Sequence, residues 1–475
     1  MSSDIQISLS AVQSQLWEGE KHEKTILARK GTKIHRYNFF YTLLKTYQLL
    51  VFHLFYKKVE VVGRENIPVD SPVIFTPNHQ NALMDALIVL DTAGGLNPVF
   101  LTRADIFKKP LLRKILTFLK MLPVYRIRDG NEELSRNDEI FATCIDILSD
   151  SHSISIMPEG NHGYQRRLRP LVKGAFRIAF QAQEEFGDAH PVKIVPVGID
   201  FQDYQKIRQD LLVIYGQPIE VSEYIEMHRE NPPMALNALR DRLSDELKKI
   251  IIHIENEEHY AMFQDLRGLY NSSFRHPSSG LYQRFLADKE MIRVLNEKVI
   301  SDPEQISRLS EIVARYMAGL QELNLRNWVI EQTGFSLFRI LLQSLLLILT
   351  FPVFVAGFLT NLIPYSIPIR MSRNVKDTQF KSSVRFGLAM FIFLFYYLIV
   401  GALMAILIIP VWISLTVLGG MLISGNVALF YGFSFKKLRA ALRFRALSAN
   451  GDGRIIRLKE LYKQIIGTMD EIMGS

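Results

Sequence analysis

The sequence predicts an α/β domain with a mixed, mainly parallel sheet flanked by helices, then a helical extension and C-terminal transmembrane helices. Three observations lead to this prediction. Short apolar runs alternate with amphipathic stretches between residues 59 and 221, which is typical of strands and the helices that connect them. Residues 222–332 are charged and have helical periodicity. Residues 333–435 then form a long region that is poor in charge.

The composition is that of a folded chain with a net positive charge. The 475 residues are 48% hydrophobic and 22% charged, with a net charge of +8. These values exclude a disordered or disulfide-rich chain, and the positive charge suits an anionic lipid, a phosphorylated substrate or a nucleic acid. The long apolar region favours a phospholipid membrane as the partner and argues against nucleic acid. The only cysteine, Cys144, excludes an internal disulfide, and we expect no metal site.

The N-terminal part of the chain predicts a helix at the membrane surface. Residues 1–35 are polar with mixed charges, so we expect no cleavable signal peptide. Residues 36–58 are apolar and aromatic, with Lys45 in their interior and basic residues at both ends. Because a span needs about 20 mostly uncharged residues, this lysine argues against a crossing. We expect a membrane-docking helix in the interface, with an ordinary core helix as the alternative.

The predicted α/β domain, residues 59–221, contains seven candidate strands. Several are continuous apolar runs, as expected for strands that are buried on both faces. The candidates are residues 59–63, 72–77, 98–102, 122–126, 153–157, 193–199 and 211–215. Amphipathic stretches at 137–148 and 174–186 predict helices between them. The result is a mainly parallel or mixed sheet.

The helical extension, residues 222–332, carries no chemical motif. Its clearest helical periodicity is at residues 234–257 and 304–324. We therefore expect it to contribute packing or control of substrate access.

The transmembrane region, residues 333–435, contains two apolar stretches. Residues 386–431 hold 46 residues without a charged side chain, enough for two crossings with Pro410 near the middle. Residues 335–363 contain Pro352 and Gly357 and predict either one tilted span or a kinked hairpin that enters and leaves on the same side.

The distribution of charge favours the hairpin. Residues 365–386 and the basic tail, residues 436–475, are rich in Lys and Arg, which favours the cytoplasmic side for both. A re-entrant stretch at 335–363 places the α/β domain on this side too. We therefore expect an integral membrane protein whose α/β domain lies on the cytoplasmic face of an inner or organelle membrane.

The first chemical motif runs from Thr76 to Asp85 and opens an apolar helix at residues 86–90. Histidine suits a general base near neutral pH, and a carboxylate fixes its tautomer and stabilises its cation. A spacing of six would place His79 and Asp85 on different faces of a regular helix. The pair therefore works only if His79 lies in the turn and Asp85 in the helix. A capping or core histidine is the alternative.

Three further blocks place charged or small residues at predicted strand ends. Arg126 can hold a phosphate through two parallel hydrogen bonds, the alternative being a surface arginine. Glu159 can bind hydroxyls or hold its loop, and Gly160 allows a close approach of backbone to ligand. Lys173 precedes a predicted helix whose N-terminus favours an anion. Pro196 lies in an apolar strand end, with a plain core strand as the alternative.

In their order and spacing, the four blocks resemble the glycerolipid acyltransferase family, which includes the lysophosphatidate and glycerol-3-phosphate acyltransferases. The resemblance covers about residues 59–221, and the preceding helix is similar to the family's membrane-docking N-terminal motif. His79 matches the catalytic base and Asp85 its charge-relay partner. Arg126 matches the phosphate-binding arginine. The other positions that match substrate-binding blocks, with Pro196 at an acyl channel, are Glu159, Gly160, Lys173 and Pro196.

Two features depart from the common family pattern. Five residues separate His79 from Asp85 where the family usually has four, and Asn161-His162 replaces the usual Thr-Arg. The longer spacing and the hydrophobic C-terminal region are similar to the yeast-type glycerol-3-phosphate acyltransferases.

The resemblance implies transfer of a fatty acyl chain from an acyl thioester to a hydroxyl of a glycerol phosphate in phospholipid biosynthesis. Its acyl donor is acyl-CoA or acyl carrier protein, with no tightly bound cofactor. The acceptor is 1-acylglycerol 3-phosphate or glycerol 3-phosphate. Two alternatives remain open: an acyltransferase or transacylase that acts on another lysophospholipid, and a non-catalytic membrane lipid-binding protein.

Overall fold

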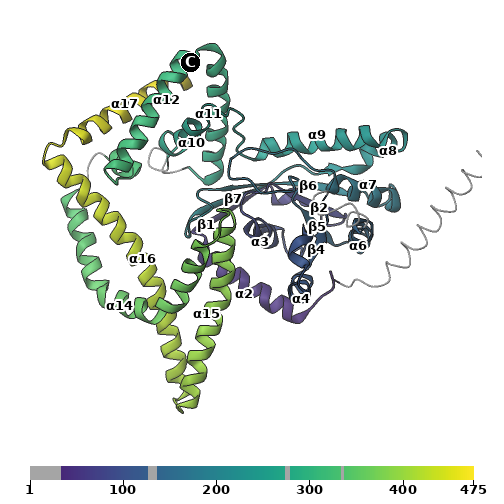
Figure 1. The fold of residues 1–475 in the computed structure, drawn as a ribbon, viewed down its shortest axis with the longest axis horizontal. Coiled ribbons are helices and arrows are strands. Elements are labelled where there is room, and N and C mark those ends of the chain that lie inside the picture. Colours follow the sequence, from purple (N-terminus) through teal and green to yellow (C-terminus); the bar gives the residue numbers. More distant parts are fainter. Residues whose placement is uncertain (1–33, 127–135, 273–278, 333–335, 475) are drawn as a thin grey trace, which may run out of the picture. The chain divides into compact units, whose positions relative to one another are not determined.

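The computed structural model describes residues 34–126, 136–272, 279–332 and 336–474. The chain divides into two compact units, Met1–Ile251 and Ile252–Ser475. The first unit contains a β-sheet with helices on both faces, and the described part of the second unit is helical (Figure 1).

An eight-stranded sheet forms the centre of the first unit, in the order β1-β7-β6-β2-β5-β3-β4, with β8 paired to β6. All neighbours are parallel except the β6–β7 and β6–β8 pairs, which confirms the predicted mixed, mainly parallel sheet. The strands are β1 (Lys58–Val62), β2 (Val73–Pro77), β3 (Val99–Arg103), β4 (Met121–Val124), β5 (Ser153–Ile156), β6 (Lys193–Phe201), β7 (Asp210–Tyr215) and β8 (Ile219–Glu220).

Burial explains why the strands were recognisable in the sequence. Every residue of β2, β5 and β7 is buried, and β2 and β7 accordingly appear as largely apolar runs. All seven predicted strands are present, with ends that differ by at most two residues. Strand β8 was not predicted because two residues carry no periodicity.

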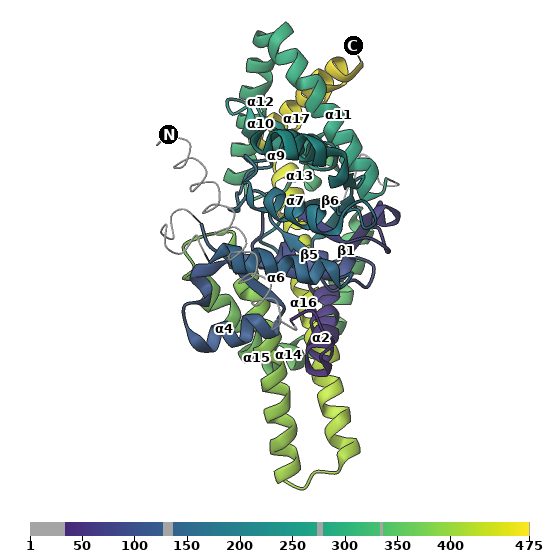
Figure 2. The ribbon, with the colours of Figure 1, turned by 90° about the vertical axis from the view of Figure 1, so that its right-hand side faces the viewer.

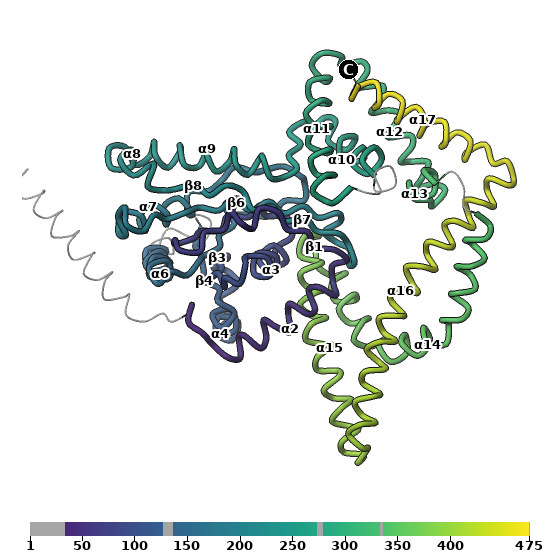
Figure 3. Tube along the Cα trace, turned by 180° about the vertical axis from the view of Figure 1, so that it is seen from behind, coloured from purple at the N-terminus to yellow at the C-terminus, as the bar shows by residue number. Residues whose placement is uncertain are grey.

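The helices of the first unit are α2 (Phe39–Phe55), α3 (Leu83–Thr92), α4 (Pro110–Phe118), α6 (Asn137–Ser149), α7 (Gly174–Phe186), α8 (Ile225–Glu230) and α9 (Pro232–Ile250). One hydrophobic core joins the sheet to α6, α7 and α9, with Ile74, Ile147, Phe180 and Leu243 fully buried in it. Helices α2 and α3 lie on the other side of the sheet (Figures 1 and 3).

Helix α9 belongs to the first unit, so the boundary predicted at residue 221 falls inside this unit. Leu239, Leu243 and Leu247 are fully buried in the core against the sheet. The helix ends at Ile250, before the end predicted at residue 257, because Ile251 adopts an extended conformation. Residues 222–251 therefore complete the α/β layer instead of starting a separate extension.

The described part of the second unit contains three helices that are long and apolar enough to cross a membrane: α14, α15 and α16. Helices α15 and α16 are separated by residues 407–410, which confirms the predicted break at Pro410 and is visible in Figure 2. The elements of this unit are α10 (Tyr260–Leu269), α11 (Leu281–Ser301), α12 (Pro303–Glu322), α13 (Asn327–Glu331), α14 (Leu337–Arg373), α15 (Phe380–Ile406), α16 (Val411–Ala449) and α17 (Gly453–Gly474).

Helix α14 bends back on itself. Its first half lies beside α16, where the Gln343 side chain donates to the carbonyl of Ser434 (3.1 Å). Its end lies beside α15, where Arg385 Nε donates to Ser372 Oγ (3.4 Å). Both ends of α14 therefore lie far from the connection at residues 407–410 (Figures 1 and 3). The re-entrant form of residues 335–363 stays a prediction.

The bend contains a buried polar cluster centred on Asn361. Its side-chain amide donates to the carbonyls of Gly357 (3.0 Å) and Met421 (3.1 Å), and its oxygen accepts from the Tyr397 hydroxyl (2.9 Å). Proline within the helix, as at Pro364, removes a backbone donor and permits a bend. These hydrogen bonds satisfy polar groups that would otherwise be costly in an apolar region.

The close contact between β6 and α9 generates a stability prediction. A Cβ atom at Gly198 would lie 2.0 Å from the carbonyl oxygen of Ile250. Gly198→Ala must therefore force the helix away from the sheet, at a cost of roughly 1–3 kcal/mol. We expect faster amide hydrogen exchange in β6 and α9. Gly174→Ala is the control, because its Cβ would meet only Ile156 Cδ1 at 3.9 Å; equal exchange in the two variants would contradict the prediction.

Candidate active site

A histidine and an aspartate pair in the turn between β2 and α3. His79 Nδ1 lies 2.9 Å from Asp85 Oδ2. Asp85 is the third residue of α3 and is fully buried, whereas the His79 side chain is partly accessible. The structure thus has His79 in the turn and Asp85 in the helix, the arrangement that the spacing of six requires. An imidazole held at Nδ1 keeps Nε2 for another partner.

Asp85 also holds the turn itself. The backbone N–H groups of Gln80 and Asn81 both donate to its Oδ2 (2.9 and 2.8 Å). Ala82 has a φ of 45°, a conformation that non-glycine residues rarely adopt. Such strain persists only where the surroundings impose it and is frequent at functional sites. The carboxylate thereby fixes both the ring and the backbone of the motif.

Glu159 and Arg169 hold His79 from its backbone side. The Glu159 carboxylate accepts from the backbone N–H of His79 (2.7 Å) and, on its other oxygen, from Arg169 Nε (2.9 Å). Arg169 in turn donates through Nη2 to the carbonyl oxygen of His79 (3.2 Å). Both backbone groups of His79 are therefore bound by one ion pair. Of the two roles predicted for Glu159, this geometry is that of holding the loop.

The environment of Glu159 is water-poor. Burial raises the pKa of its carboxyl group, while the charge of Arg169 and the backbone donors act in the opposite direction. A buried carboxylate of this kind is stable only with paired, hydrogen-bonded partners. Arg169 was not identified from the sequence, because it lies ten residues after Glu159 in an irregular loop.

Arg126 is directed toward the loop that follows Glu159. Its Nη1 donates to Asn161 Oδ1 (3.3 Å), and its Nη2 lies 4.0 Å from Asp105 Oδ1. Arg103, and to a smaller extent Arg126, holds the pKa of Asp105 below its ordinary value. The Arg126 side chain is about one-fifth exposed.

The two residues that depart from the family pattern lie against the predicted site residues. Asn161 contacts Arg126, and the ring of His162 lies edge-on to that of His79, with centroids 5.6 Å apart at 90°. Sequence reasoning noted both only as departures. The structure joins His79 to Arg126 through this dipeptide.

The remaining predicted residues lie at different distances from this cluster. Gly160 has a φ of 67° in the turn after Glu159, where a Cβ would lie 3.1 Å from Val172. Lys173 is exposed at the start of α7, directly after Val172. Pro196 is buried within β6, and its described contacts are with strand residues and Gly216. Its role at an acyl channel remains a prediction.

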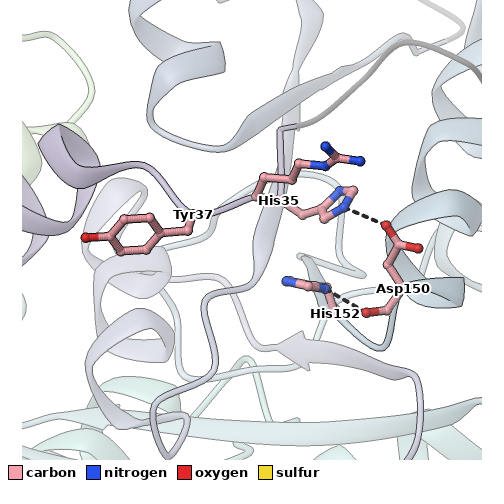
Figure 4. Close-up of a pocket in the computed structure, with 5 residues that line it drawn as sticks. His35, Tyr37, Asp150 and His152 are labelled. Carbon is pink, nitrogen blue, oxygen red and sulfur yellow. Dashed lines mark hydrogen bonds and ion pairs between the residues drawn. The ribbon is translucent and has the colours of Figure 1, made fainter.

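A second cluster of histidines lines a pocket elsewhere in the first unit. Figure 4 shows His35, Asp150 and His152 in this pocket, with His35 Nε2 2.8 Å from Asp150 Oδ2. His152 directly precedes β5, whereas Glu159 follows it, so the pocket lies at the opposite end of this strand. Burial lowers the pKa of His35. In the described part of the chain, no three His, Cys, Asp or Glu side chains are arranged to hold a metal ion.

Comparison with known proteins places these blocks in a family. Residues 58–200 match the Acyltransferase family model. Glycerol-3-phosphate O-acyltransferase 1 of Saccharomyces cerevisiae is 26% identical over 188 residues, which are 39% of this chain and 24% of that protein. The human 1-acyl-sn-glycerol-3-phosphate acyltransferase alpha is 26% identical over 165 residues, 34% of this chain and 53% of that protein. The chain thus spans about a quarter of its yeast relative.

A solved structure also matches. It is the 1-acyl-sn-glycerophosphate (LPA) acyltransferase from Thermotoga maritima, with 18% sequence identity and a TM-score of 0.31, covering 43% of this chain and 78% of that one. The family match spans the sheet from β1 to β6 and includes His79, Asp85, Arg126 and Glu159. Residues 58–200 therefore match the Acyltransferase family, and the proteins they are similar to are glycerolipid acyltransferases.

Proposed function

We propose that this protein transfers a fatty acyl chain from an acyl thioester, acyl-CoA or acyl carrier protein, to a hydroxyl of a glycerol phosphate in phospholipid biosynthesis. The observation that carries the proposal is the His79–Asp85 pair, with 2.9 Å between Nδ1 and Oδ2, in a braced turn. The family match supports the reaction class. The three apolar helices support an enzyme bound to a membrane, and we place its catalytic domain on the cytoplasmic face.

In this proposal, His79 is the general base. Its Nε2 takes the proton of the acceptor hydroxyl as the oxygen attacks the thioester carbonyl. When the tetrahedral intermediate collapses, the carbon–sulfur bond breaks and the imidazolium returns the proton to the thiolate. Asp85 stabilises the imidazolium and holds its tautomer through the bond to Nδ1. No covalent acyl-enzyme is needed.

Arg126 binds the phosphate of the acceptor, with Lys173 as a second cation. A guanidinium forms two parallel hydrogen bonds with phosphate oxygens, and Arg126 is partly accessible for them. Fixing the phosphate positions the hydroxyl for attack, which is a large contribution to such reactions. The loop bearing Asn161 and His162 contacts both the base and Arg126, so it lies where the acceptor would bind.

The acceptor is glycerol 3-phosphate or its 1-acyl derivative. The yeast relatives are named for glycerol 3-phosphate and the mammalian relatives for 1-acyl-sn-glycerol 3-phosphate, at similarly low identity. Both acceptors share the phosphate and a free hydroxyl, which are the groups that Arg126 and His79 would recognise. Parallel assays with the two acceptors, and with other lysophospholipids, rank them.

Removal of the base tests the proposal directly. Membranes that contain the wild type should transfer labelled acyl groups from acyl-CoA or acyl carrier protein to one of the acceptors. His79→Ala should reduce kcat by about 10²–10⁴-fold, the usual contribution of a general base. His190→Ala, at an exposed position in the same unit, is the control and should retain full activity. Full activity in His79→Ala would rule out this mechanism, and no transfer by the wild type would favour a lipid-binding role.

Neutralising Arg126 should weaken binding of the phosphate. Arg126→Gln should raise the KM for the acceptor by about 10–100-fold, the loss expected for charged hydrogen bonds, and should change the KM for the acyl donor little. Arg177→Gln, on the exposed side of α7, is the matched control. An unchanged acceptor KM in Arg126→Gln would assign phosphate binding to another residue.

The ion pair of Glu159 and Arg169, which binds the backbone of His79, predicts a different kinetic effect. Arg169→Gln should lower kcat, because a misplacement of about 1 Å can cost about 100-fold in rate, and should leave the acceptor KM unchanged. Arg167→Gln, two residues away, is the control. A raised acceptor KM with an unchanged kcat would show that Arg169 binds substrate and does not position the base.

A further inference from the structure

Helix α4 exposes its apolar side chains to the exterior. The structure describes the whole helix, and none of its residues is buried. Leu111, Leu112, Ile115 and Phe118 are 71%, 42%, 43% and 39% exposed. At about 100° per residue these four side chains share one side of the helix. A surface helix normally turns such an apolar side toward the core, so α4 requires an apolar partner.

Helix α2 presents a second exposed apolar stripe. Phe39, Leu43, Leu50 and Leu54 recur with helical spacing and are all exposed. The opposite side of the helix faces the protein, where Tyr41, Gln48 and Phe52 are buried. The helix therefore has an inner apolar side that is satisfied by packing and an outer apolar side that is not.

The two helices lie next to each other at the surface of the first unit. The ring centroids of Tyr41 in α2 and Phe118 in α4 are 6.3 Å apart, and Lys120 Nζ lies 4.8 Å from the Tyr41 ring centroid. Figures 1 and 3 show α2 and α4 on the same side of the sheet. We call this surface the α2–α4 face; it consists of Phe39, Phe40, Leu43, Leu50, Leu54, Leu111, Leu112, Ile115 and Phe118.

Basic residues border the apolar part of α4. Lys108 and Lys109 precede the helix, and Arg113 and Lys114 lie within it, all of them exposed, while α4 contains no acidic residue. Leucines and a phenylalanine bordered by cations match the interface of an anionic bilayer, where acyl chains lie below phosphates. A second copy of this chain would bring like charges together, which is unfavourable.

We propose that α4 is a second membrane-docking helix, and that the α2–α4 face lies in an anionic phospholipid surface with its basic residues on the headgroup phosphates. The sequence predicted such a role for α2 alone. Residues 104–107, which end two residues before α4, include Asp105, which lies 4.0 Å from Arg126. Docking through α4 would therefore bring lipid to a helix that the chain connects closely to a contact of the proposed phosphate-binding residue.

Site-directed spin labelling of the full-length protein tests this proposal without an activity assay. The only cysteine, Cys144, is fully buried and does not compete for the label. Labels are attached to Leu112→Cys in α4, Leu43→Cys in α2 and Met234→Cys in α9, an exposed apolar control. The protein is reconstituted in vesicles of phosphatidylcholine and phosphatidylglycerol. Relaxation by oxygen and by a water-soluble nickel chelate reports the depth of each label.

We expect the labels at 112 and 43 to lie about 5–10 Å below the phosphates and the label at 234 to lie in water. Replacing Lys108, Lys109, Arg113 and Lys114 together by Gln should move only label 112 outward. A water-exposed label 112 beside a buried label 43 would overturn the proposal, since α2 alone would then dock. Spin–spin broadening between copies at position 112 would also overturn it, because a second copy would cover the face. An inactive protein with both labels in lipid would contradict only the proposed function.

Discussion

The buried carboxylate of Asp85 is the interaction on which the candidate site depends. A fully buried charge is tolerated only where donors surround it, and one of its oxygens lies within 2.9 Å of the His79 ring and of two backbone N–H groups. The same oxygen therefore orients the imidazole and closes the turn that carries it. Loss of this group would release the imidazole of His79 and the turn at Gln80 and Asn81 together. The same carboxylate oxygen of Asp85 therefore determines both where the His79 ring lies and which of its nitrogens carries the proton.

The parallel sheet brings the other parts of the site to this turn. Strands β2 and β5 are parallel neighbours, so the residues that follow them emerge at the same edge of the sheet. This register explains how Glu159 binds the backbone of His79 across 80 residues of sequence. Strand β4 is the parallel neighbour of β3, so Arg126, which follows β4, emerges at the same edge and contacts Asn161 in the loop after Glu159. The residues His79, Arg126 and Glu159 each follow a strand, and the sheet order places these three strand ends near one another.

The sequence predicted the parts that have a periodic or compositional signal. The seven longer strands, helix α7 and the break at Pro410 appear where apolar runs or proline indicated them. The role of Arg169 was not predictable, because an ion pair across an irregular loop has no local pattern. Helix α4 was missed for another reason: the whole helix is only nine residues long and lies between two strands. From the sequence, α9 was assigned to the helical extension and not to the α/β domain, because its charged outer side resembles that of the helices that follow.

The proposed reaction explains why such a protein would contact a membrane in two ways. Burial of a methylene contributes about 0.8 kcal/mol, so drawing one chain of about 16 carbons into water would cost more than 10 kcal/mol. An enzyme that adds acyl chains to a glycerol phosphate gains by working at the interface, where the product's chains remain in lipid. Apolar helices such as α15 and α16 can hold the protein in the membrane, but they do not orient a soluble site. The α2–α4 face, which lies on the same unit as His79, is suited to that second task.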